Sequence, residues 1–194
     1  EALDRLHAPG VAAAVWRRGR PEPLGPWLDA LPPERLPRFR ARLGVPQVGA
    51  AVDAACGIAG LAPGPERRAL ASDLGALAAL FGRLTGSAEV DVRLEAIATD
   101  GCRRYHVDRV RARLLCTLPG PGTELALPAP GGSVRLLRQL AAGEVAALRG
   151  TLWPGEETGL LHRSPPVEGT GTVPLLFVLD PADGPDDTSC GCCP

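Results

Sequence analysis

Apolar residues in the first 88 positions recur at the spacing of α-helices. The clearest case contains Leu70, Leu74 and Leu77, which lie three or four residues apart and would share one helix face. Shorter helices are predicted at residues 27–31 and 35–43, because prolines or a glycine bound each run. We therefore expect this part of the chain to be helical.

From residue 89 onward the period changes to two. Val90, Val92 and Leu94 alternate with charged residues, which is typical of a strand with one buried face. Residues 135–140 are expected to form a short helix inside a connection. Further strands, separated by turns rich in Gly and Pro, are predicted at residues 105–118, 124–127, 145–148, 159–162 and 175–179. Many short strands with such turns favour a β-sandwich or a jelly-roll barrel.

These patterns divide the chain into three parts. Residues 1–88 are expected to form a helical part, residues 89–180 a β-rich core, and residues 181–194 a flexible, cysteine-rich tail. A length of 194 residues is enough for one domain with a substantial apolar core. The expected fold class is therefore α+β, with a helical N-terminal layer on a β-barrel.

The composition narrows the classes of function to consider. The net charge is -1, so no overall basic field favours nucleic acid or an anionic membrane as partner. No apolar run approaches the ~18–20 residues that a membrane span requires. Six cysteines in 194 residues are too few for a disulfide scaffold, and arginines follow the early apolar run instead of preceding it as in a secretory signal. We expect a cytoplasmic protein with reduced thiols.

Two of the three histidines lie in polar clusters that suggest a metal site. His106 and Asp108 are two residues apart in a predicted strand, so their side chains would point to the same face. His162 follows in a later predicted strand. Two histidines and one carboxylate hold a divalent metal on one side and leave open positions for chemistry. Candidates for hydrogen bonds that support these ligands are Arg104, Tyr105 and Glu124.

The order of these residues resembles that of the iron(II)- and 2-oxoglutarate-dependent oxygenases and their cupin-like relatives. In the double-stranded β-helix of those enzymes, a jelly-roll or cupin-like barrel, the H-x-D pair comes from an early strand and the second histidine from a late one. The resemblance implies Fe(II) bound by His106, Asp108 and His162, with dioxygen and 2-oxoglutarate as candidate co-substrates.

The segment after the distal histidine departs from the oxygenase pattern. Those enzymes usually carry an arginine or lysine there to bind the far carboxylate of 2-oxoglutarate, whereas this chain has Thr, Val and Pro at residues 172–174. Arg163, Arg113 or Arg111 would have to substitute. We take Arg163 and Arg113 as candidate catalytic residues that orient an anionic group. The predicted function is an Fe(II)-dependent dioxygenase-like activity on an unidentified small molecule or peptide.

Four motifs carry a second resemblance: they are CRRYHVD at 102–108, RLLCT at 113–117, GPGTE at 120–124 and LHRSPP at 161–166. In these motifs and over most of its length, the chain resembles an uncharacterised bacterial family, domain of unknown function 1826. The resemblance is densest between residues 94 and 180 and implies no particular reaction. Members of that family tend to be encoded near zinc-homeostasis and metallochaperone genes, which implies a connection with metals.

The cysteines leave a second class of function open. Cys190, Cys192 and Cys193 could chelate Zn(II), and Cys102 together with His106 offers another set of zinc ligands. The alternative function is therefore a non-catalytic zinc-binding protein linked to metal homeostasis. A structural domain without metal is a third alternative. A Cys–His–Asp hydrolase fits poorly, because a His and an Asp two apart on one strand do not form a relay through the imidazole.

Overall fold

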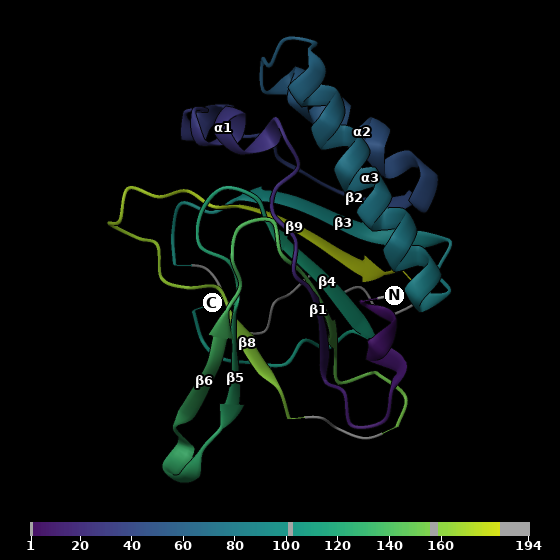
Figure 1. The fold of residues 1–194 in the computed structure, drawn as a ribbon, viewed down its shortest axis with the longest axis vertical. Helices are drawn as coiled ribbons and strands as arrows, with labels where there is room; N and C mark the ends of the chain where they lie inside the picture. Colours follow the sequence, from purple (N-terminus) through teal and green to yellow (C-terminus); the bar gives the residue numbers. More distant parts are fainter. Residues whose placement is uncertain (1, 101–102, 156–158, 183–194) are drawn as a thin grey trace.

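The computed structural model describes residues 2–100, 103–155 and 159–182, and it combines helices with antiparallel sheets (Figure 1). In these parts of the chain, a six-stranded sheet has the order β1-β7-β4-β9-β3-β2 and a three-stranded sheet has the order β6-β5-β8. The strands are β1 (Ala13–Trp16), β2 (Phe39–Gly44), β3 (Glu89–Ala96), β4 (Ala112–Thr117), β5 (Glu124–Pro128), β6 (Val134–Gln139), β7 (Val145–Arg149), β8 (Leu161–Arg163) and β9 (Leu175–Pro181). From β4 onward the chain crosses repeatedly between the two sheets: β4, β7 and β9 belong to the larger sheet, and β5, β6 and β8 belong to the smaller one.

Helices cover one face of the larger sheet. Figure 1 shows α2 and α3 side by side above this face. The helix predicted around Leu70, Leu74 and Leu77 is confirmed as part of α3, and these side chains share one core with Val92 and Phe177 of the sheet. The helices are α1 (Leu24–Asp29), α2 (Val48–Ile58) and α3 (Pro65–Thr85), with short 3-10 turns at Asp4–His7, Pro33–Arg35, Val45–Gln47 and Pro130–Gly132.

Two glycines allow α2 and α3 to approach closely. A Cβ atom on Gly75 would lie 3.3 Å from the Cα atom of Gly49, and one on Gly49 would lie 3.0 Å from the carbonyl oxygen of Ala71. The absence of side chains at this crossing therefore lets the two backbones pack against each other.

Strand β3 sends its alternate side chains into two different surroundings. Val90, Val92 and Leu94 are fully buried in the core under the helices. Arg93, from the opposite face of the strand, lines a cavity that also contains residues of the smaller sheet. A second, smaller apolar cluster contains Leu115, Leu125, Leu140, Ala146, Leu148 and Val178. One face of the larger sheet thus packs into the apolar core under the helices, and the opposite face lines the candidate site.

Three predicted elements are wrong. Residues 35–43 form a 3-10 turn followed by β2, because the chain pairs in register with β3 and tertiary pairing outweighs helix propensity. Residues 135–140 belong largely to β6, which forms a hairpin with β5. Residues 105–111 contain a single β-bridge residue, and the strand predicted there begins only at Ala112.

The N-terminal part contains strands as well as helices. Strand β1 pairs with β7, and β2 pairs with β3, so the first 88 residues supply both edges of the larger sheet. The division into a helical part and a β-rich core remains a prediction, and most of the proposed tail lies outside the described residues. Among the helices that the structure describes, none is long and apolar enough to cross a membrane.

Candidate metal centre

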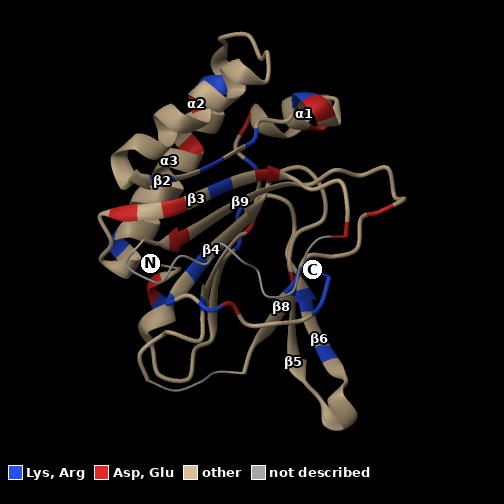
Figure 2. Ribbon diagram, turned by 180° about the vertical axis from the view of Figure 1, so that it is seen from behind, with Lys and Arg blue, Asp and Glu red and all other residues tan. Residues whose placement is uncertain are grey.

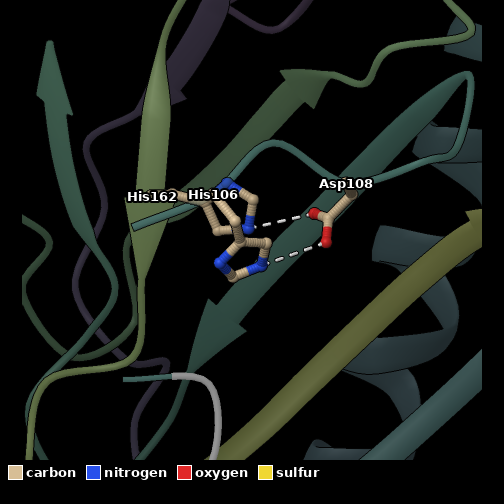
Figure 3. Close-up of side chains that lie close together, drawn as sticks. All are labelled: His106, Asp108 and His162. Carbon is tan, nitrogen blue, oxygen red and sulfur yellow. Dashed lines mark ion pairs between the residues drawn. The ribbon is translucent and has the colours of Figure 1, made fainter. Parts of the chain in front are cut away.

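Three predicted ligands come together between distant segments of the chain. His106 lies in the loop before β4, Asp108 two residues later, and His162 in the middle of β8. One ligand atom of each lies within 4.8 Å of the others. Figure 3 shows both imidazole rings directed at the carboxylate of Asp108. The centroids of the two rings lie 4.4 Å apart.

Backbone hydrogen bonds bring the two histidines side by side. The N–H of His106 donates to the carbonyl of His162 and the N–H of His162 donates to the carbonyl of His106, both at 3.0 Å. This narrow antiparallel pair replaces the strand predicted at residues 105–108. It extends the smaller sheet by one residue, so His106 is positioned by β8 instead of by a strand of its own.

A glycine allows the loop that carries Asp108 to pack tightly. The N–H of Thr151 donates to the carbonyl of Asp108 at 2.9 Å. A Cβ atom on Gly150 would lie 2.0 Å from the carbonyl oxygen of Val110 and 2.8 Å from that of Asp108. No side chain fits there, so Gly150 is required for the observed path of this loop.

The histidines present their Nε2 atoms to the carboxylate. Nε2 of His106 lies 3.3 Å from Oδ1 of Asp108, and Nε2 of His162 lies 2.9 Å from Oδ2. Nδ1 of His106 lies 2.8 Å from the carbonyl oxygen of Arg104. In the tautomer in which Nδ1–H donates to that carbonyl, Nε2 carries a free lone pair, as metal-binding histidines commonly do. Arg104 thus supports a ligand through its backbone.

The donor set fits a divalent metal. Oδ2 of Asp108 is buried and receives no hydrogen bond of good geometry within the described structure, although His162 lies close to it. A buried carboxylate oxygen without a donor is costly, and a cation would satisfy it. Two imidazole nitrogens and one carboxylate suit Fe(II) and Zn(II) alike.

The charge of Asp108 is stabilised by its neighbours. Burial alone would raise the pKa of this carboxyl, but the imidazoles of His106 and His162 and the guanidinium of Arg113 hold the pKa well below its usual range. Nη1 of Arg113 donates to Oδ1 of Asp108, while Nε and Nη2 donate to Asp180 at 2.7 and 2.6 Å. All three charged side chains are buried. Arg113 therefore fixes the orientation of Asp108.

Arg163 has a different environment from Arg113. Its Nε donates to Glu124 at 2.7 Å, and its guanidinium lies 4.4 Å from the centre of the Tyr105 ring. The Tyr105 hydroxyl donates to the same Glu124 carboxylate at 2.6 Å. Burial alone would raise the pKa of Glu124, but these two donors lower it. Glu124 thus links Tyr105, the neighbour of His106, to Arg163, the neighbour of His162.

A cavity of about 780 Å³ opens onto this centre. Such a volume is in the range of sites for small molecules. His106, His162 and Arg113 line one part of it, together with Arg163. On β9 the cavity is lined by Leu176 and Val178, so the strand after the distal histidine contributes apolar side chains to it. This agrees with the departure from the oxygenase pattern seen at residues 172–174.

Several residues of this site were not predicted from the sequence. Asp180 has no motif around it, and its pairing with Arg113 depends on the register between β4 and β9. Three further arginines on the cavity wall lie in segments assigned to a helix or to a solvated strand face: Arg38, Arg40 and Arg93.

The cysteines contribute no ligand to the described centre. Cys56 and Cys116 are buried free thiols, and burial raises the pKa of each to about 11. The zinc ligand sets proposed at Cys102 and in the C-terminal tail lie outside the described residues.

The chain belongs to the family of proteins of unknown function DUF1826, whose model matches residues 1–180. No curated protein matches the chain. Similar solved structures include dioxygenase for auxin oxidation 1 from Arabidopsis thaliana, in a complex with 2-oxoglutarate, at 15% identity and a TM-score of 0.49. The alignment covers 79% of this chain and 65% of the Arabidopsis chain. A Pseudomonas putida prolyl-4-hydroxylase aligns at 15% identity and a TM-score of 0.46, covering 94% of this chain and 98% of its own.

Proposed function

We propose that this protein is a mononuclear Fe(II)-dependent oxygenase. The observation that carries the proposal is the cluster of His106, Asp108 and His162, whose two histidines line a cavity large enough for a small molecule. A structural zinc site is closed by four protein ligands, whereas three ligands on one side leave positions for substrate and dioxygen.

The strand connectivity supports the same class. From β3 to β9 the chain crosses repeatedly between the two sheets. The order is β7-β4-β9-β3 in one sheet, and the other has the order β6-β5-β8 and is extended by the bridge to His106. This interleaving is the arrangement expected of a double-stranded β-helix with helices packed outside it. In that fold the H-x-D pair and the distal histidine would lie on adjacent strands of the smaller sheet.

Each charged residue has a proposed role at the centre. When bound, Fe(II) would supply one-electron chemistry with dioxygen. Arg113 holds Asp108 in a fixed orientation. It is a positioning residue, because its guanidinium already donates hydrogen bonds to two carboxylates, those of Asp108 and Asp180. Arg163 lines the cavity and would contact an anionic group of a bound molecule. The apolar side chains Leu176 and Val178 would limit the access of water.

As a co-substrate, 2-oxoglutarate would require a cation that binds its far carboxylate. The cavity has no arginine from β9 among its lining residues, so a carboxylate would need a partner from another strand. The alternative, a non-catalytic zinc-binding protein, uses the same three ligands and is distinguished by the metal that the protein retains and by the absence of turnover.

The test is metal content after anaerobic purification and after reconstitution with Fe(II) or Zn(II). We expect one equivalent in the wild type and its loss in a His106→Ala/His162→Ala variant. His7→Ala is the matched control, because His7 contacts the carbonyl of Leu84 away from the centre. Zinc retained by the double variant would refute the triad as the metal site. If the purified protein contains zinc, and the protein reconstituted with Fe(II) consumes no oxygen, the alternative is favoured.

A further inference from the structure

The arginines on the cavity wall nearest the metal ligands are already paired with carboxylates. The guanidinium of Arg113 donates hydrogen bonds to Asp108 and Asp180. Nε of Arg163 donates to Glu124 at 2.7 Å. Arg113 is buried together with both of its partners, and breaking a buried ion pair leaves an uncompensated charge at a cost in stability. An anion that entered the cavity would therefore compete with contacts that hold the centre together.

The other arginines that line the cavity, near β2 and on β3, are engaged as well. Nη2 of Arg38 donates to the carbonyl of Pro33 at 2.9 Å. Nη2 of Arg93 lies 3.4 Å from Oδ2 of Asp180, and Arg40 has an interaction partner too. Figure 2 shows both acidic and basic segments along β3. The wall thus carries charges of both signs, and in the metal-free protein an anion gains little from electrostatic attraction.

Beside these ion pairs the floor of the cavity is apolar. Leu115 of β4 and Val178 of β9 are direct partners in the antiparallel register, and both line the cavity. Side chains two positions apart on a strand share a face. Leu115 therefore lies on the same face as Arg113, while Val178 and Leu176 lie on the same face as Asp180. The apolar floor thus begins one row of residues from the arginine that holds the metal-binding carboxylate.

Two segments outside the central strands complete the lining. The loop after β3 adds the apolar side chains of Ile97 and Ala98. Thr123 and Ser164 add hydroxyl groups on the side of the smaller sheet, and a hydroxyl can both donate and accept a hydrogen bond. Apolar walls with a few polar groups are typical of sites that bind and orient small organic molecules.

We propose that the cavity binds an uncharged, largely apolar small molecule, whose aliphatic or aromatic part rests on Leu115, Leu176 and Val178. Such a molecule gains free energy by leaving water and breaks no ion pair of the wall. Each CH2 group that it buries should strengthen binding about fourfold. An anionic co-substrate would instead depend on the charge of the bound metal.

The role of this molecule as a substrate rests on the proposed function, because the same cavity also contains the histidines of the metal centre. Its binding does not rest on that function. The apolar floor lies on β4 and β9, whereas the metal ligands lie on β8 and in the loop before β4. The two proposals can therefore fail independently.

The experiment is a titration of the metal-free protein with 1-butanol, 1-hexanol and hexanoate, followed by saturation-transfer NMR of the probes. We expect saturable binding of 1-hexanol, with an affinity about tenfold or more above that of 1-butanol, because two further CH2 groups are buried. Hexanoate has the same chain length but carries a charge, so it should bind more weakly than 1-hexanol. Equal affinities for the two alcohols, or tighter binding of hexanoate, would overturn the proposal.

Substitutions at the floor locate the binding site. Leu176→Asn should weaken the binding of 1-hexanol about tenfold, because a polar amide replaces the apolar contact, and Leu176→Met should recover most of the affinity. Leu152→Asn is the matched control, since Leu152 is 40% exposed and does not line the cavity. Thermal melting reports whether each variant is folded. Unchanged affinity in a folded Leu176→Asn protein would overturn the assignment, and the comparison of probes on the wild type stands even if that variant fails to fold.

Addition of Mn(II) separates this proposal from the proposed function. Paramagnetic Mn(II) held by the triad should accelerate the nuclear relaxation of bound 1-hexanol, because the apolar floor begins beside the centre. The His106→Ala/His162→Ala protein should still bind 1-hexanol but lose this acceleration. If the wild type binds 1-hexanol and takes up no metal, the proposed function fails and the apolar site stands. Bound Mn(II) without faster relaxation of bound 1-hexanol would overturn the placement of the molecule in this cavity.

Discussion

Arg113 is predicted to be among the residues whose loss destabilises the protein most. Its side chain is 8% exposed and lies between Asp108 at 5% and Asp180 at 9%. Arg113→Met removes the guanidinium but keeps much of the aliphatic volume, so two buried carboxylates lose their shared cation. Removing one partner of a buried ion pair costs about 3–5 kcal/mol, a large part of the ~5–15 kcal/mol that stabilises a typical domain.

Urea unfolding followed by tryptophan fluorescence measures this loss. With an m-value of ~2–3 kcal/mol/M, the midpoint should fall by roughly 1–2 M. Arg42→Met is the matched control, because its ion pair with Asp91 is exposed at 41% and 36% and should contribute at most ~1 kcal/mol. Excess Zn(II) should stabilise Arg113→Met more than the wild type, since a cation beside Asp108 would replace part of the missing charge.

A double-mutant cycle with Asp180→Asn separates the charge effect from lost packing. The Arg113→Met/Asp180→Asn protein should be less destabilised than the sum of the two single variants, because it buries one unpaired carboxylate fewer. If Arg113→Met loses no more stability than Arg42→Met, or if the two substitutions are additive, the buried ion cluster does not stabilise the fold as this reasoning requires.

Three further predictions concern the surroundings of the centre. Gly150→Ala should destabilise the fold and lower metal occupancy, because its Cβ atom would lie 2.0 Å from the carbonyl oxygen of Val110; Gly19→Ala, with open space around it, is the control in unfolding and metal assays. Cys116 should resist alkylation at pH 8 in the folded protein and react after unfolding, as peptide mass spectrometry would show, because burial raises its pKa to about 11. The lowered pKa of Asp108 means that its ionised form stabilises the fold above its unfolded pKa of ~4 and that this contribution is lost as the pH falls further. In acid titrations of the metal-free protein, the free energy of unfolding of Asp108→Asn should therefore fall less steeply with decreasing pH than that of the wild type.

The candidate ligands could be predicted because their chemistry is restrictive. The chain has three histidines, and two of them lie in polar segments that are far apart in the sequence. The predicted strands bring these two segments next to each other in a barrel. The reason given for the H-x-D pair was nevertheless wrong. His106 and Asp108 face the same point because a backbone pair with His162 and a tight loop at Gly150 hold them, not because they alternate along a strand.

The residues that complete the cavity depend on strand register, which local patterns do not reveal. Residues 35–43 are bounded by Pro and Gly as a helix would be, although Phe39, Ala41 and Leu43 alternate with arginines. Only the pairing of β2 with β3 places Arg40 opposite Arg93. The hydrogen bonds between Arg113 and Asp180 likewise join residues of β4 and β9 that are 67 positions apart in the sequence. From the sequence alone, the charged residues of β3 cannot be distinguished from those of a solvent-exposed strand face. Only the position of the second sheet shows that they line a cavity.

The charges around the centre connect the metal site with the cavity beside it. Asp108, Asp180 and Arg113 together form a buried group with a net charge of -1. A divalent cation held by neutral imidazoles would change this charge to +1, next to Arg93 and in the same cavity as Arg40. An anion in this cavity should therefore bind more tightly once the metal is present. Because coupling between two binding sites is reciprocal, the same anion must then strengthen metal binding by an equal factor. Each ligand should therefore bind more tightly when the other is already bound than when it is absent.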